Sequence, residues 1–319
     1  MSFIRTVLGD ISPRDLGVCY AHEHIIIDKC FATERYPEFL IDSAALATAE
    51  LTEFHKAGGR AMVDSMPANC GRNVLKLAEV SRATGVHILC PTGLHLSKYY
   101  PPGHWAERMS VDELAALFVA EIETGIDAHD FAGSEIHRSG HRAGVIKVAG
   151  GLNTLSPHER RLFEAAAQAQ VRTGCPILTH VEEGTAALEQ IEILKTGGAD
   201  LAHVVLSHTD RKPELNYHRE ILSSGVKVEY DSCFRWKSEQ GNPTLDLLTA
   251  LLPEFPNQIM LGMDAARRSY WKSYGGGPGL TFLLTTFTEI MRDAGIAQAL
   301  IHKVFVENPA STFQFGGRA

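Results

Sequence analysis

The chain has 319 residues, a formal net charge of −8 at pH 7, a hydrophobic fraction of 45% and a charged fraction of 21%. These values are typical of a globular protein with a large core, and the acidic balance argues against a nucleic-acid partner. No segment approaches the roughly 18 consecutive apolar residues of a membrane span, and residues 1–10 lack the apolar segment of a signal peptide. Six cysteines without a C-x-x-C pair favour reduced thiols. We therefore expect a cytoplasmic protein without a membrane partner.

Taken in chain order, short apolar runs alternate with segments of helical periodicity, which is typical of βα units around a parallel sheet. Helices are expected at residues 43–57, 73–84 and 111–125, and a capping box with proline at the first helical position opens another at Ser156. This pattern predicts an α/β protein, a single (β/α)8 TIM barrel domain over residues 1–319. A doubly wound open sheet is the alternative, but it rarely needs so many parallel units. The eight strands are expected at residues 17–27, 60–65, 86–93, 144–149, 175–180, 203–208, 227–231 and 258–264.

The stretch Tyr20-Ala-His-Glu-His24 lies near the end of the first predicted strand. Side chains two positions apart on a strand point to the same side, so His22 and His24 can aim two imidazoles at one point while Glu23 faces away. Two neutral imidazoles on one short strand suit a divalent metal such as zinc. Taken alone, the pattern is somewhat better explained by one histidine that caps a turn and another that fills the core. Residues further along the chain change that balance.

Polar side chains recur at or near the C-terminal ends of the predicted strands, where (β/α)8 barrels build their active sites. Each of them alone could be a hydrogen-bonded polar group of the core. Six in corresponding places favour one shared site over coincidence. They are His22, His24, Lys147, His180, His208 and Asp264.

Lys147 is the most informative of these residues, because it lies within the apolar strand Val145-Ile-Lys-Val-Ala149. A buried cation without a partner is costly and tends to lose its proton. A neutral lysine amine can react with carbon dioxide to form a carbamate, which offers two oxygen ligands and could bridge two metal ions. The alternatives are a lysine paired with a carboxylate, or one that extends to the barrel mouth.

In this order, the six residues resemble the pattern of the phosphotriesterase family within the amidohydrolase superfamily. The resemblance covers nearly the whole chain, and it is specific as an ordered set although no single piece is. Within the family, one run of this chain is similar to the branch that hydrolyses phosphorylated sugar lactones. This run is Arg268-Ser-Tyr-Trp-Lys-Ser-Tyr-Gly-Gly-Gly-Pro-Gly279. Further matching segments are Thr6-Val-Leu-Gly-Asp10, Ala21-His-Glu-His24, Leu178-Thr-His180, Leu206-Ser-His208, Leu261-Gly-Met-Asp264 and Asn308-Pro-Ala-Ser-Thr-Phe313.

The resemblance implies a binuclear centre. His22, His24 and Asp264 would hold the more buried metal ion, and His180 and His208 the more exposed one. An N6-carboxylated Lys147 and a hydroxide would bridge the two ions, and the catalytic Asp264 would accept the proton of that hydroxide and pass it to the leaving group. The mixed nitrogen and oxygen ligands favour zinc, with manganese or cobalt as alternatives. The same resemblance implies a homodimer, since barrels of this family are often dimers.

The loops that follow the last two strands concentrate cations although the chain is acidic. Arg267, Arg268 and Lys272 follow Asp264, and Arg235 and Lys237 follow the seventh strand. Arginine offers a bidentate fork to phosphate or carboxylate, and lysine a point charge, so these loops predict an anion pocket. The alternative is a set of solvated loop charges. The resemblance makes Lys237, Arg268 and Tyr270 the candidates for a substrate phosphate, and Arg267 and Tyr99 are further candidates for substrate contacts.

These observations together predict a metal-dependent hydrolase that opens a lactone, expected to be a phosphorylated furanose lactone. A phosphotriesterase and a lactonase or esterase for unphosphorylated substrates are the alternatives within the same reaction class. A triester or a long acyl chain would favour an apolar pocket, which gives no reason for several cations. A protein that binds metals but has lost catalysis is the alternative of a different class, and the complete ligand set argues against it.

Overall fold

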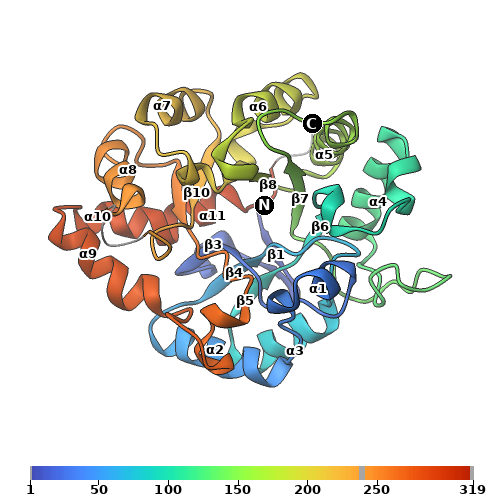
Figure 1. Ribbon diagram of the computed structural model, residues 1–319, viewed down its shortest axis with the longest axis horizontal. Helices are drawn as coiled ribbons and strands as arrows, with labels where there is room; N and C mark the ends of the chain where they lie inside the picture. Colours follow the sequence, from blue (N-terminus) through green and yellow to red (C-terminus); the bar gives the residue numbers. More distant parts are fainter. Residues whose placement is uncertain (1, 237–240, 317–319) are drawn as a thin grey trace.

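The computed structural model describes residues 2–236 and 241–316. Parallel strands form a closed ring at its centre, and helices surround this ring on the outside (Figure 1). One ladder joins three strands and a second joins six, and the backbone amides of Met263 and Asp264 donate to the carbonyl of His22 where the last strand meets the first. The expected (β/α)8 barrel is confirmed. Its strands are β3 (Cys19–Glu23), β4 (Ala61–Asp64), β5 (His87–Leu89), β6 (Pro91–Gly93), β7 (Val145–Gly150), β8 (Ile177–Val181), β9 (Val204–Ser207), β10 (Lys227–Tyr230) and β11 (Ile259–Leu261).

The third predicted strand, residues 86–93, is divided into two short strands. β5 pairs with β4 on one side and β6 pairs with β7 on the other, with Cys90 between them. Pro91 has no backbone N–H, so it cannot continue the ladder as a donor at this point. The two pieces together occupy one position of the barrel, which preserves the predicted count of eight.

Several outer helices begin at side-chain caps that can be recognised in the sequence. Ser43 and Asn73 each accept a hydrogen bond from the first turn of their helices. The predicted box at Ser156 is present, since its hydroxyl accepts from the amide of Glu159 and the Glu159 carboxylate accepts from the amide of Ser156. The helices are α1 (Phe31–Arg35), α2 (Ala44–Lys56), α3 (Val74–Thr84), α4 (Val111–Glu123), α5 (Pro157–Thr173), α6 (Ala187–Thr196), α7 (Leu215–Ser223), α8 (Pro243–Leu251), α9 (Thr288–Asp293), α10 (Gln298–His302) and α11 (Asn308–Thr312).

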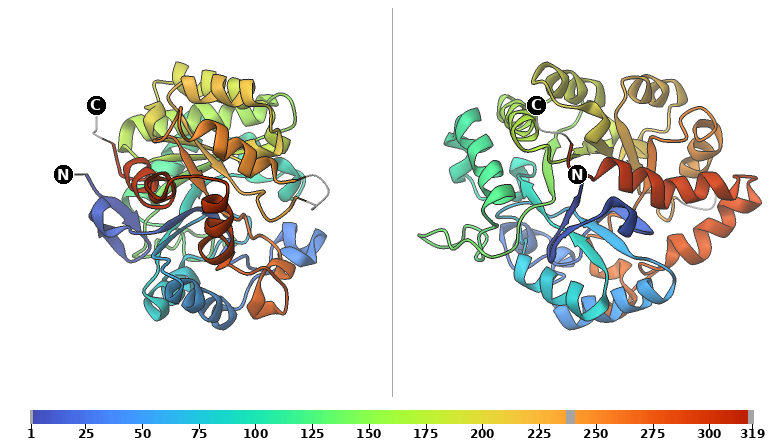
Figure 2. Two further views of the ribbon diagram at one scale, coloured as in Figure 1. Left: turned by 90° about the vertical axis from the view of Figure 1, so that its left-hand side faces the viewer. Right: turned by 180° about the vertical axis from the view of Figure 1, so that it is seen from behind.

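A short antiparallel hairpin, β1 (Ile4–Thr6) with β2 (Gly9–Ile11), precedes the barrel and was not predicted. Its turn residue Val7 donates its amide to the carbonyl of Ile88, which lies in β5. Ile4 packs with the side chains inside the barrel, and so does Phe313 from the C-terminal helix. Both chain ends lie on the same side of the molecule (Figure 2). The hairpin and the last helix therefore fill the barrel at its N-terminal end.

Two layers of apolar side chains stabilise the barrel. The larger layer lies between the strands and the helices, and the smaller one fills the interior. Among the described residues, no helix is long and apolar enough to cross a membrane. All six cysteines are free thiols, as their spacing predicts.

Candidate metal centre and active-site cavity

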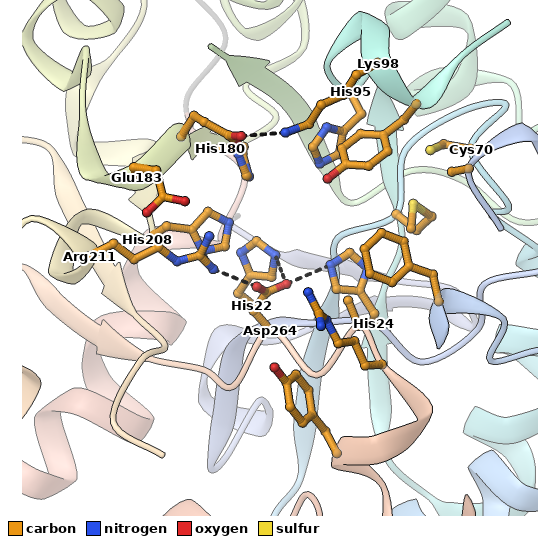
Figure 3. A pocket seen from close by; sticks show the side chains of 18 of the residues that line it. His22, His24, Cys70, His95, Lys98, His180, Glu183, His208, Arg211 and Asp264 are labelled. Carbon is orange, nitrogen blue, oxygen red and sulfur yellow. Dashed lines mark hydrogen bonds and ion pairs between the residues drawn. The ribbon is translucent and has the colours of Figure 1, made fainter. Parts of the chain in front are cut away.

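A cavity of about 360 Å³ opens at the C-terminal ends of the strands. Ligand cavities of small molecules range from roughly 300 to 1,000 Å³, so this one suits a small substrate. Its apolar wall contains Phe39, Met66 and Tyr99. Figure 3 shows the histidines around it with Asp264 between them. Five of the six predicted metal ligands line it, namely His22, His24, His180, His208 and Asp264.

A compact group is formed by His22, His24 and Asp264. The distance from Nε2 of His24 to Oδ1 of Asp264 is 3.1 Å, and that from Nε2 of His22 to the same oxygen is 3.7 Å. Their potential ligand atoms all lie within 4.8 Å of one another, so one cation could contact all three side chains. His180 and His208 lie next to this group, with a ring-centroid distance of 4.6 Å between them and of 4.7 Å between His208 and His22.

Three of the four histidines have one ring nitrogen held by another side chain. Nδ1 of His22 lies 2.8 Å from the Ser207 hydroxyl, Nδ1 of His208 is bonded to the Asp231 carboxylate, and Nε2 of His180 is bonded to the Glu182 carboxylate. A carboxylate accepts the N–H, so the lone pair of His208 lies on Nε2 and that of His180 on Nδ1. This arrangement orients histidines that ligate a metal.

Burial keeps these imidazoles neutral, which metal binding requires. Desolvation lowers the pKa of His22 and of His180 below the usual value. Desolvation and the Arg211 guanidinium together lower the pKa of His208 to about 3.

Lys147 is buried within β7 and does not line the cavity. Its Nζ has no hydrogen-bond partner among the described residues, although neighbouring carboxylates act on it electrostatically. Desolvation lowers its pKa to about 8, against the opposing effect of Asp264 and Glu229. An amine that loses its proton more readily than an ordinary lysine, and that has no hydrogen-bond partner among the described residues, is chemically suited to carboxylation. The unpartnered Nζ is also the observation that fits a metal-bridging ligand at this position.

Two of the predicted ligands lie outside the strands, in left-handed backbone conformations. His208 follows β9 with φ +69°, and Asp264 follows β11 with φ +45°. Such conformations are uncommon for residues other than glycine and concentrate at functional sites. They turn both side chains over the barrel mouth. His24 likewise follows β3 rather than ending it, so the predicted first strand, residues 17–27, is shorter than expected.

Two arginines hold the far oxygen of Asp264. Nη2 of Arg211 lies 2.8 Å from Oδ2 and Nη2 of Arg235 lies 3.1 Å from it, while Oδ1 faces the two imidazoles. Burial alone would raise the pKa of Asp264, but Arg235 and His24 outweigh it and keep the pKa well below its usual range. Asp264 is therefore an ionised carboxylate with one oxygen directed at the candidate metal position.

Only some of the residues predicted to contact the substrate line the cavity. Arg267, Tyr270 and Tyr99 line the cavity. Arg268 does not: its Nε donates to the carbonyl of Leu40 and its Nη2 lies 3.4 Å from Asp42. Lys237 lies outside the described residues.

Arg235 is one of the loop cations found in the sequence, but its guanidinium is already bonded to other groups of the protein. It donates to Asp231, to the carbonyl of Met263 and to the backbone and side chain of Asp264. Arg267 differs, because its guanidinium lies over the Phe39 ring and no ion pair holds it within the described part of the chain. Arg267 is thus the cavity arginine best able to bind an anion.

Several residues of the site were not selected from the sequence. Asp231 is the last residue of a predicted strand, and the other six residues lie at or near such ends, so the same rule could have identified it. Glu182 follows His180 by two residues, and its carboxylate contacts both His180 and Lys98. Arg211 follows His208 by three residues and carries no local signal, because its role depends on the approach of Asp264 from the next strand but one.

Residues 2–313 match the model of the phosphotriesterase family. The chain belongs to this family. A similar curated member is a phospho-furanose lactonase of Mycoplasmopsis synoviae (strain 53), with 31% identity over 98% of this chain and 92% of that protein. The relatives named lactonases and organophosphorus hydrolases agree with the expected enzyme class, so this phosphotriesterase-family protein is a hydrolase.

Two solved structures of the family have the same fold. A lactonase from Listeria monocytogenes superposes with a TM-score of 0.90 and 30% identity, over 99% of this chain and all of that one. The phosphotriesterase homology protein of Escherichia coli, described with phosphate in its active site, superposes with a TM-score of 0.83 and 31% identity over 94% and 99% of the two chains. The buried histidine and carboxylate groups of this phosphotriesterase-family chain are consistent with a metal site of the family.

Proposed function

We propose that this enzyme is a binuclear metal-dependent lactonase that opens the ring of a phosphorylated furanose lactone. The observation that carries the proposal is the combination of a buried, metal-competent histidine and carboxylate group with a small cavity that is also lined by Arg267, whose guanidinium has no ion pair within residues 2–236 and 241–316. Zinc is the first candidate for the metal, followed by manganese and cobalt, because the ligands are nitrogen and oxygen.

The proposal divides the candidate ligands between two ions, and the compact group of His22, His24 and Asp264 supports one of the two positions. His22, His24 and Asp264 would hold one, His180 and His208 the other, and an N6-carboxylated Lys147 would contribute to both. Bound there, the metals would acidify a water molecule and polarise the lactone carbonyl.

Asp264 has two tasks in the proposal, because its two oxygens face different partners. The carboxylate accepts the proton of the attacking water and later passes it to the alkoxide oxygen that leaves when the ring opens. Arg211 and Arg235 fix the orientation of the carboxylate through Oδ2.

Two features support a phosphorylated substrate. Arg267 offers a bidentate fork that matches a phosphate, and Tyr270 lines the same side of the cavity and can donate its hydroxyl. A relative is named a phospho-furanose lactonase, and another has phosphate in its active site. The volume of about 360 Å³ suits one sugar ring with its phosphate better than a long acyl chain.

The test is a panel of furanose lactones, each with and without a 5-phosphate, together with a neutral phosphotriester, on metal-loaded protein. We expect kcat/KM for the phosphorylated lactones to exceed that for their unphosphorylated counterparts by about 100-fold, since a charge-assisted contact contributes about 1.5–3 kcal/mol. Chelation should abolish activity and zinc should restore it. Equal kcat/KM with and without phosphate would overturn the substrate assignment, and full activity after chelation would overturn the metal-dependent chemistry.

A further inference from the structure

Two buried glutamates lie beneath the candidate metal centre, and they differ in their surroundings. Glu23, on β3, accepts hydrogen bonds from the amides of Met263 (2.8 Å) and Ala265 (3.3 Å), so it joins β3 to the chain after β11. Glu229, on β10, is fully buried, and neither of its carboxyl oxygens has a hydrogen-bond donor among the described residues. The hydrogen bonds of Glu23 explain its burial as a contribution to the stability of the fold. The burial of Glu229 has no such explanation among the described residues.

Glu229 faces His22. Its Oε2 lies 3.7 Å from Nδ1 of His22, the same nitrogen that lies 2.8 Å from the Ser207 hydroxyl. Gly262 leaves room for the carboxyl, because a Cβ at that position would be only 2.7 Å from Oε1 of Glu229. The opposite nitrogen of the ring, Nε2, faces Asp264. The His22 imidazole therefore lies between the candidate metal position and an unpartnered carboxyl group.

This placement has a physical reason if His22 binds a cation. A buried carboxyl without a donor is costly unless a nearby positive charge offsets it. An imidazole that binds a dication through Nε2 becomes more positive at Nδ1–H, and acceptors on that side orient the ring and strengthen the ligand. Burial raises the pKa of Glu229 well above its usual range, and the like charge of Asp231 raises it further, so Asp231 offers no positive charge to offset an ionised Glu229.

We propose that Glu229 is a positioning residue for the metal centre, which acts together with Ser207 on His22 to strengthen cation binding. This inference rests on the proposed function. It concerns the affinity of the protein for the metal and not the recognition of substrate.

The test measures zinc affinity without substrate, by competition of the full-length protein with a chromophoric chelator. In Glu229→Gln, which preserves shape and removes charge, we expect zinc affinity to fall by about 10- to 100-fold. Ser207→Ala should weaken binding in the same direction. The visible absorption spectrum of the cobalt-loaded protein should also change in Glu229→Gln, because the ligand field of His22 changes.

Glu121→Gln is the matched control, since Glu121 is equally buried but pairs with Arg72 away from the cavity. It should lower thermal stability and leave zinc affinity unchanged. Zinc affinity of Glu229→Gln within twofold of wild type, or tighter, would overturn the inference while the lactonase proposal stands. Absence of zinc binding by the wild-type protein would instead overturn the proposed function. If Glu229→Gln does not fold, Ser207→Ala and Glu229→Asp decide: unchanged affinity in both rejects the role.

Discussion

Two regions surround the cavity, and they are held in place by different means. The strand-end layer contains the candidate metal ligands His22, His24, Lys147, His180, His208 and Asp264. The loop rim contains the loops above them, including the loop after β11 with Arg267 and Tyr270. In the strand-end layer, the imidazoles are bonded to side chains that lie on barrel strands or directly after them, as His22 of β3 is to Ser207 of β9 and His208 is to Asp231. In the rim, side chains are held by contacts between loops, such as that of Arg268 with Leu40. Groups that must keep one geometry are best placed on rigid elements, whereas loops can vary with the substrate. We therefore expect the strand-end layer to carry the reaction chemistry and the loop rim to determine the choice of substrate.

The largest expected effect tests the strand-end layer. Lys147→Met removes the amine but preserves length, so it prevents carboxylation. We expect kcat to fall by about three orders of magnitude, because several kcal/mol of metal-dependent stabilisation are lost. Metal content, measured by elemental analysis, should fall below that of wild type.

Thermal unfolding of the chelated protein provides the contrast. Because the buried amine of Lys147 has no hydrogen-bond partner in the described part of the chain, its replacement by methionine should leave the melting temperature unchanged or raise it. A lower melting temperature with normal metal content would show that the lysine stabilises the fold rather than the metal centre.

An intermediate effect tests the rim. Arg267→Ala should raise KM for a phosphorylated lactone by about 10- to 100-fold, since it removes a charge-assisted contact with the phosphate. The KM for the unphosphorylated lactone and kcat for both should change little. The readout is steady-state kinetics on the two matched substrates.

Arg268→Ala is the matched control for this variant, because the neighbouring arginine contacts Leu40 and Asp42 and does not line the cavity. Its effect should be smaller and similar for both substrates. A larger, phosphate-selective effect of Arg268→Ala would restore the assignment made from the sequence.

The smallest effect concerns how the rim is supported. Glu50, on α2, is buried and accepts hydrogen bonds from the amides of Ser273 (2.8 Å) and Leu280 (3.0 Å), so it fixes the loop that follows β11. Glu50→Gln weakens these charge-assisted bonds, and we expect a rise in KM of about 3- to 10-fold with nearly constant kcat. Glu53→Gln, at an exposed position of the same helix, should have no effect on KM. Loss of kcat in Glu50→Gln would mean that the loop also positions the reacting groups.

The sequence predicted the barrel because hydrophobic periodicity and caps are local signals. The strand count was correct even where Pro91 divides the third strand, since both pieces occupy one position. The strand ends were less accurate: His208 and Asp264 leave their strands through left-handed conformations that periodicity does not reveal.

The residues of the site could be predicted where they lie at the ends of strands, and much less so where their position depends on contacts between loops. The histidines converge because parallel strands end at the same edge. The direction of Arg268 depends on the course of residues 40–42, and the position of Arg211 depends on where Asp264 arrives. Both are long-range contacts, so no local pattern distinguishes the arginine that lines the cavity from its neighbour.

The filled interior of the barrel has a consequence for turnover. Ile4, Leu16 and Phe313 pack inside the N-terminal end with the inner strand residues, so reactant and product share one entrance. In the proposed reaction, ring opening would convert an uncharged ester group into a carboxylate, so the product would carry one more negative charge past Arg267 than the substrate did. We expect the ring-opened acid to compete with lactone for the cavity. When this product accumulates, its release should limit the turnover rate.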